Sequence, residues 1–346
     1  MAEAPRRKLK SADKSDTSTD SKLVAISIKM RAVQLQTTPR KLINLSPGVP
    51  ACIRLLVLAS LTISLQLGVS AQTPDRPVTL AVLDFGSTAI GRLTSEKLMA
   101  NLKQETGLMM LDRDQARAAA RGAGYAGSLN LSLNEARNLG AVLGCDFFIL
   151  GDAQTLRRSP STGPAYFDSY ASMFLVSARS GRLVSWERPN FHGATAVESE
   201  KELVAALSNE DVRHRYFGSI RRAQEDEQGE RSLIIDQQTP VIEAAPDDDK
   251  NAEAEGLRLP RAYRRLVPVY PETAARAEAE AMVDVLADLD ANGEVTRVEV
   301  ARWAGFGLDN ATVATVRQLH FFPAMRNGVA IPIRVLLRYN FRKPAK

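Results

Sequence analysis

The residues best suited to binding a metal stand together near the carboxy terminus. Residues 288–299 read Asp-Leu-Asp-Ala-Asn-Gly-Glu-Val-Thr-Arg-Val-Glu, which satisfies the spacing of an EF-hand loop whose carboxylates bind Ca²⁺. An EF-hand loop joins two helices, whereas the residues on both sides of this one alternate between apolar and polar types with the period of a strand. The alternation favours a β-hairpin whose carboxylates point apart, and we expect no metal site.

Two glycine-rich segments have spacings found in phosphate-binding loops. Residues 86–91 match the glycine spacing of a P-loop, but Arg92 and Leu93 replace the lysine and hydroxyl residue that reach the phosphates and Mg²⁺. Residues 122–127 fit G-x-G-x-x-G, but they follow a helical pattern, whereas the dinucleotide-binding motif follows a strand and opens a helix. We interpret both segments as turns and expect no cofactor.

The remaining reactive side chains are isolated from one another. His192 and His214 have no acidic residue at a spacing that would orient them as bases, and the chain has only 3 histidines. Cys145 is the one thiol after residue 71, so it cannot form an internal disulfide, and its place at the start of an apolar run indicates a buried structural thiol. We expect no catalytic residues and no enzymatic activity.

The carboxy-terminal residues carry a clear pattern of secondary structure. Apolar residues alternate around an Asn-Gly turn, and a later segment repeats apolar residues on a helical period behind Asp309, its expected N-cap. The expected elements are a helix at 272–280, strands at 283–289 and 296–300, a helix at 308–319, a turn at 326–328 and one unbroken strand at 331–341.

This run resembles the C-terminal domain of TonB-family proteins over residues 268–341. The features that match are Tyr270-Pro271, the Asn292-Gly293 hairpin, Leu308-Asp309 and Phe321-Phe322-Pro323-Ala324. The resemblance implies a small α+β domain with a three-stranded antiparallel sheet, which binds a peptide of an outer-membrane or envelope partner by β-strand addition.

We expect this peptide to add to the last strand. Two alternatives would make this edge unavailable to a peptide: arginine side chains that protect it, or dimerisation of the protein through it. The partner-binding residues implied are Arg334, Val335, Leu336, Leu337, Arg338, Tyr339 and Asn340.

The preceding residues alternate between strand and helix patterns and predict an α/β domain with a mixed sheet. Residues 78–188 resemble the α/β domain of CsgG-type envelope or secretion components, through Ala81-Val-Leu-Asp-Phe-Gly86 and the segments 111–114, 139–151 and 178–186. The expected elements are strands at 78–85, 108–111, 147–150, 166–178 and 182–186, a helix at about 93–105, an Ala-rich helix after residue 115, a helix at 132–143 with a capping box, and one charged helix at 199–227.

A net charge of +5 could indicate nucleic-acid binding, but much of the excess lies in residues 1–54, ahead of an apolar run at 55–71. That order is typical of a membrane-topology signal, and no basic face with interleaved aromatic residues accompanies it. We therefore expect no nucleic-acid partner. The expected organisation is a basic disordered tail (1–54), a signal peptide or anchor (55–71), an α/β domain (76–232), an acidic linker (233–262) and a TonB-like domain (263–346).

Two routes to export fit the apolar run. If translation starts at Met30, we expect a secretory signal cleaved after Ala71, which ends a small-residue motif. If it starts at Met1, residues 53–71 form an inner-membrane tether. Both predict a periplasmic protein.

The leading functional hypothesis is a non-enzymatic envelope protein that binds a partner peptide during transport across, or assembly at, the outer membrane. The alternative is a CsgG-like secretion or assembly component. The apolar run lacks the histidine, and the linker the long proline-rich span, that TonB proper uses in energy transduction, so the sequence favours binding over transduction.

Overall fold

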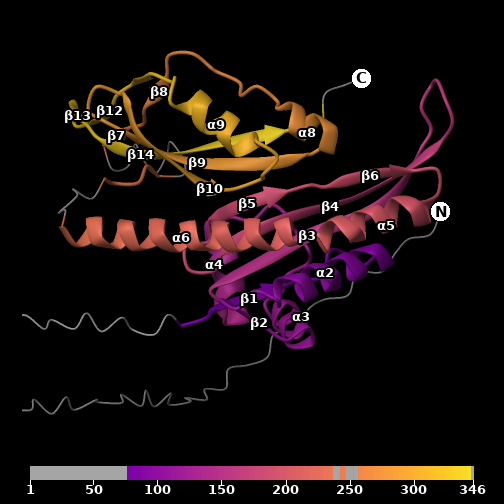
Figure 1. The fold of residues 1–346 in the computed structure, drawn as a ribbon. Helices are drawn as coiled ribbons and strands as arrows, with labels where there is room; N and C mark the ends of the chain where they lie inside the picture. The colour runs from indigo at the N-terminus through magenta and orange to yellow at the C-terminus, as the bar shows by residue number, and fades with distance from the viewer. Residues whose placement is uncertain (1–75, 237–241, 247–251, 253–255, 344–346) are drawn as a thin grey trace, which may run out of the picture. The chain divides into compact units, whose positions relative to one another are not determined.

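Apolar strands that alternate with amphipathic helices build a mixed sheet in the first part of the described chain (Figure 1). The computed structural model describes residues 76–236, 242–246, 252 and 256–343. The predicted tail and the predicted apolar anchor lie outside these residues. Among the described residues, no helix combines the length and apolar character that crossing a membrane requires.

The first sheet has the strand order β2-β1-β3-β4-β5, with β6 also pairing with β4. The strand β1 pairs in parallel with β2 and β3, and β4 is antiparallel to its neighbours. All residues of β1 are buried, as its continuous apolar sequence predicts. The strands are β1 (Val78–Val82), β2 (Leu108–Met110), β3 (Phe147–Arg158), β4 (Tyr166–Ser177), β5 (Leu183–Glu187) and β6 (Asn190–Gly193).

Helices cover this sheet on both faces. One face packs a core with apolar residues of α2, α5 and α6, and the other packs against α3 and α4. The helix α4 begins at the predicted capping box of Ser132 and ends at Gly144, whose φ of 68° is left-handed. The helices are α2 (Ala89–Leu102), α3 (Arg113–Gly122), α4 (Leu133–Leu143), α5 (Ala196–Leu207) and α6 (Glu210–Asp236).

Two predicted elements of this part differ in more than the position of their ends by a few residues. The strand expected to end at Leu150 continues to Arg158, because its half-buried second part pairs along all of β4. The single charged helix expected at 199–227 is two helices, α5 and α6. The side-chain amide of Asn101 donates to the carbonyls of Leu207 and Asn209 at 2.9 and 2.8 Å, which stabilises the break between them.

The carboxy-terminal residues form the predicted α+β domain, whose main sheet has the order β10-β9-β14 and is antiparallel throughout. The helix α9 contacts β9 and β10. The predicted unbroken last strand is interrupted at Pro332, which has no N–H to donate. The elements are β7 (Leu257–Arg258), β8 (Arg261–Ala262), α8 (Glu272–Ala277), β9 (Ala281–Leu289), β10 (Val295–Arg302), α9 (Leu308–Val316), β11 (Phe321–Phe322), β12 (Ala324–Arg326), β13 (Val329–Ile331) and β14 (Ile333–Phe341).

Two short strands lie inside the segment predicted to be a linker. The strand β7 pairs with β12, and β8 pairs with β11. Residues 257–262 therefore extend the carboxy-terminal domain towards the amino terminus.

The loop between β10 and α9 packs against the first sheet, so both parts share one hydrophobic core. The ring of Phe174, on β4, stacks on Trp303 at 5.9 Å between centroids and meets Phe306 edge-on at 5.5 Å. Gly305 has a φ of 74°, and a Cβ there would stand 2.5 Å from the ring of Phe174. This close approach requires glycine at position 305.

Candidate functional site

The edge strand β14 contains every residue predicted to bind a partner. It pairs with β9 in an uninterrupted register from Ile333↔Leu289 to Phe341↔Ala281. Its alternating sequence gives the strand two faces: Ile333, Val335 and Phe341 are buried, whereas Leu336 is 51% exposed. The edge strand is thus held firmly on one side by β9.

Two arginines of β14 are paired across the strand with buried aspartates. Arg334 donates to Asp288 through Nε and Nη2 at 2.5 and 2.8 Å, and Arg338 donates to Asp284 at 2.7 and 3.0 Å. These hydrogen bonds raise the pKa of both guanidinium groups. Arg334 and Arg338 therefore hold β14 to β9 as bidentate pairs.

The backbone of Arg334 identifies the open side of the strand. Its N–H donates to the carbonyl of Glu243 and its carbonyl accepts from the N–H of Ala245, each at 2.8 Å, so both groups point away from β9. Because this direction alternates along an antiparallel strand, the backbone groups of Leu336, Arg338 and Asn340 point the same way. Within the described part of the chain, these three residues have no backbone partner on that side.

The predicted edge from Arg334 to Asn340 is not free along its whole length, because the backbone of Arg334 is already paired. The chain's own segment Glu243–Ala245 forms a parallel bridge with Arg334. Nothing in the sequence of this segment distinguishes it from the surrounding linker, because one bridge needs only an extended backbone. The open edge consists of Leu336 to Asn340.

A groove of about 570 Å³ lies beside this open edge. Its walls are residues 337–342 and the segment from Arg264 to Tyr270. The hydroxyl of Tyr270 donates to the carbonyl of Ala279 at 2.6 Å, and its ring lies 6.3 Å from that of Phe341. The groove therefore offers apolar rings next to arginine side chains.

In the hairpin that matches the EF-hand spacing, the carboxylates of Asp288 and Asp290 accept hydrogen bonds from other groups of the protein. Asp288 binds Arg334, while the carboxylate of Asp290 accepts from the N–H groups of Asn292 and Glu294 at 2.9 and 2.8 Å. These hydrogen bonds with the backbone lower the pKa of Asp290. A Cβ at Gly293, with φ of 85°, would meet the carbonyl oxygen of Phe321. The motif thus builds a tight turn between β9 and β10.

The other sequence candidates have structural contacts as well. In residues 86–91, which match the glycine spacing of a P-loop, Thr88 caps α2 by accepting a hydrogen bond of 3.0 Å from the N–H of Gly91. Burial raises the pKa of the Cys145 thiol to about 12, which keeps it protonated and unreactive near neutral pH.

Asp309 is not the N-cap of α9, because Gly307 occupies that position. The Asp309 carboxylate instead accepts hydrogen bonds from the N–H groups of Ala304 and Gly305, both at 2.8 Å.

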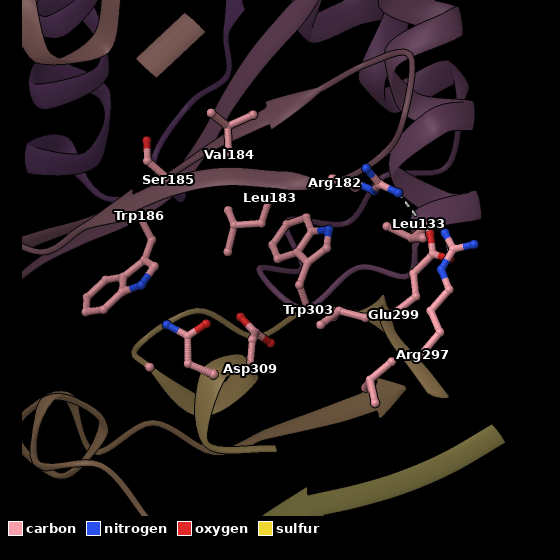
Figure 2. A pocket seen from close by; sticks show the side chains of 14 residues that line it. Leu133, Arg182, Leu183, Val184, Ser185, Trp186, Arg297, Glu299, Trp303 and Asp309 are labelled. Carbon is pink, nitrogen blue, oxygen red and sulfur yellow. Dashed lines mark hydrogen bonds and ion pairs between the residues drawn. The ribbon is translucent and has the colours of Figure 1, made fainter. Parts of the chain in front are cut away.

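A second cavity, of about 610 Å³, lies between β5 and β10 (Figure 2). Both tryptophans of the chain, Trp186 and Trp303, line it. Figure 2 shows Trp303 between side chains of β5 and Asp309, with the Arg182–Glu299 pair on one side. Periodicity could not identify this cavity, because it is made from two strands more than 100 residues apart.

Comparison with known proteins identifies one part of the chain. Residues 267–342 match the family model described as the Gram-negative bacterial TonB protein C-terminal. No curated protein matches the chain.

Three solved structures are among those with similarity to parts of the chain. The TonB C-terminal domain of Pseudomonas aeruginosa has 19% identity and a TM-score of 0.22, and the match covers 25% of this chain and 89% of that one. Lipoprotein GNA1162 of Neisseria meningitidis has 15% identity, 39% and 99% coverage and a TM-score of 0.28. The LpoB C-terminal domain of Salmonella enterica has 14% identity, 39% and 92% coverage and a TM-score of 0.24.

These TM-scores are low, so the assignment depends on the family match together with the observed α+β domain. The Tyr-Pro start, the hairpin, the helix and the Phe-Phe-Pro-Ala exit all lie within the matched residues. The sheet of β10, β9 and β14 with its helix α9 has the predicted architecture. Residues 267–342 of this chain match the TonB C-terminal family model and have the α+β architecture expected from it.

Proposed function

We propose that this protein is a non-enzymatic periplasmic protein that binds a peptide of an outer-membrane or envelope partner by β-strand addition to β14. The observation that carries the proposal is the open backbone edge of Leu336, Arg338 and Asn340 in a TonB-type domain. An extended peptide hydrogen-bonds to such an edge, and the neighbouring groove receives alternate side chains. This binding serves transport across, or assembly at, the outer membrane.

Site-specific photo-crosslinking in cells tests this proposal. A photoreactive amino acid at Asn340, on the open edge, is expected to capture an envelope protein. The same amino acid at Val197, which is 74% exposed on α5, is the control. Capture at Val197 but not at Asn340 contradicts the proposal.

A matched pair of variants separates backbone pairing from side-chain contact. Leu336→Pro removes one outward N–H, whereas Leu336→Ala retains it and removes only the side chain. Strand addition predicts that crosslinking at Asn340 falls about tenfold in Leu336→Pro and less in Leu336→Ala. Equal loss in the two variants excludes backbone recognition.

The second candidate function is a CsgG-like secretion or assembly component, favoured by the helix-covered mixed sheet of residues 78–193. A secretion pore must form a ring, whereas a tethered peptide binder is a monomer or a dimer. Light scattering of the detergent-solubilised native protein separates the two: a closed ring of many subunits supports secretion and excludes the leading proposal.

A further inference from the structure

The segment Glu243–Ala245 occupies one end of the edge that the proposed function assigns to a partner. It runs parallel to β14, with Ala244 opposite Arg334. The two backbone hydrogen bonds of this bridge are 2.8 Å long. They use the N–H and the carbonyl of Arg334 that a longer incoming strand would need.

A side-chain contact fixes the position of this segment. The carboxylate of Glu243 accepts two hydrogen bonds from the guanidinium of Arg326, on β12, at 2.7 and 2.8 Å. This contact lowers the pKa of Glu243, so the carboxylate is ionised at neutral pH. The bidentate geometry of this ion pair fixes the register of the segment. Because the pair is exposed to solvent, it stabilises the bound position only weakly.

We infer that residues 243–245 are an internal ligand of the β14 edge, which an incoming peptide displaces when it pairs with the whole strand. The inference rests on the proposed function of β14. Two edge hydrogen bonds, one exposed ion pair and the packing of the half-buried Ala245 against the core hold the segment in place. Its attachment to the same chain gives it a high local concentration. A partner that pairs with Arg334 therefore competes with this segment, whereas one confined to Leu336–Asn340 does not.

The geometry of the parallel bridge supplies a test variant and its control. Arg334 bonds to the carbonyl of residue 243 and the N–H of residue 245, so the backbone groups of Ala244 point away from β14. Ala245→Pro removes the donor to Arg334. Ala244→Pro introduces the same residue type one position earlier and leaves both hydrogen bonds possible.

The probe is a fluorescent synthetic peptide with the sequence of residues 238–247, Gln-Thr-Pro-Val-Ile-Glu-Ala-Ala-Pro-Asp. It is titrated against residues 72–346, which form one compact unit. We expect the Kd to fall about tenfold in Ala245→Pro, because the internal segment no longer competes, and to stay unchanged in Ala244→Pro. No binding to any of the three proteins, or equal affinity for all, overturns the inference.

Amide hydrogen exchange gives a readout that does not depend on any partner. Ala245→Pro is expected to accelerate exchange at Arg334, while the amides of Leu337 and Tyr339, which face β9, stay protected if the fold is intact. Unchanged exchange at Arg334 also overturns the inference.

The two proposals can fail separately. If peptide binding and exchange behave as expected but Asn340 captures no envelope protein in cells, the internal ligand is established and the proposed function fails. If Asn340 captures an envelope protein but Ala245→Pro changes neither peptide binding nor exchange, the proposed function stands and the internal ligand is overturned.

Discussion

The indole Nε1 of Trp303 donates a hydrogen bond of 3.0 Å to the carbonyl of Gly181, 122 residues earlier in the chain. Trp303 is 1% exposed and directly follows β10, whereas Gly181 lies in the turn between β4 and β5. The stacking of Trp303 on Phe174 strengthens the same junction. The TonB-type domain is therefore joined to the α/β domain through a shared core.

Removing the indole N–H should destabilise this junction. Trp303→Phe leaves the Gly181 carbonyl without its donor, which should lower the free energy of unfolding by about 1–3 kcal/mol, and Trp303→Ala by about 3–5 kcal/mol. The control is Trp186→Phe, because among the described residues the indole N–H of Trp186 makes no hydrogen bond. Urea unfolding monitored by circular dichroism measures the differences. A larger loss in Trp186→Phe than in Trp303→Phe contradicts the assignment.

Alanine at position 305 should be far more harmful than alanine at an equally left-handed glycine elsewhere. Gly305 and Gly124 have φ values of 74° and 73°, but a Cβ at Gly124 meets no atom within 4 Å, whereas one at Gly305 clashes with Phe174. Gly305→Ala should therefore destabilise the chain by about 1–3 kcal/mol more than Gly124→Ala. Thermal unfolding of the two variants compares them, and equal melting temperatures contradict the close approach.

Stability should depend on pH through Asp309. Burial raises its pKa from 3.8 to about 6, although the N–H groups of Ala304 and Gly305 act in the opposite direction. Between pH 4 and 6 the folded state thus binds more protons than the unfolded state. The contribution of Asp309 to stability therefore falls as the pH rises through this window, by at most about 3 kcal/mol.

The variant Asp309→Asn isolates this effect, because asparagine does not titrate. Urea titration at pH 4, 5, 6 and 7 measures the unfolding free energy of the unchanged chain and of Asp309→Asn. As the pH rises, the unchanged chain should lose stability relative to Asp309→Asn. A difference that is independent of pH excludes a raised pKa.

The two partners of the Arg338–Asp284 pair should differ in their effect on stability. Asp284 is 5% exposed and also lies 3.5 Å from Nε of Arg302, so Asp284→Ala leaves the half-buried Arg302 without this carboxylate. Arg338 has half of its side chain in solvent, and Asp284 keeps Arg302 when Arg338 is removed. We expect a loss of about 2–4 kcal/mol for Asp284→Ala and about 1 kcal/mol for Arg338→Ala. Chemical unfolding measures both losses of stability, and a larger loss for Arg338→Ala than for Asp284→Ala contradicts this account.

Periodicity predicted most elements of both domains, because half-buried strands and amphipathic helices must repeat their apolar residues at fixed intervals. The capping box at Ser132 and the hairpin turn at Gly293 lie where the pattern placed them, and the last strand does so from Ile333 onwards. Periodicity alone could not predict where β3 ends, or that α5 and α6 are separate helices. Those limits depend on pairing with β4 and on the amide of Asn101, which is distant in sequence.

The elements of the carboxy-terminal domain could be predicted from the chain alone, because alternation and helical period are local properties. Which of its strands lies at the edge was implied only by the resemblance to the TonB family. Which part of that edge is open could be seen only in the fold, because the hydrogen bonds of Arg334 with Glu243 and Ala245 involve backbone groups that almost every residue type carries. It also decided that Trp303 joins the two domains, because such a contact depends on shape and distance between segments far apart in the chain.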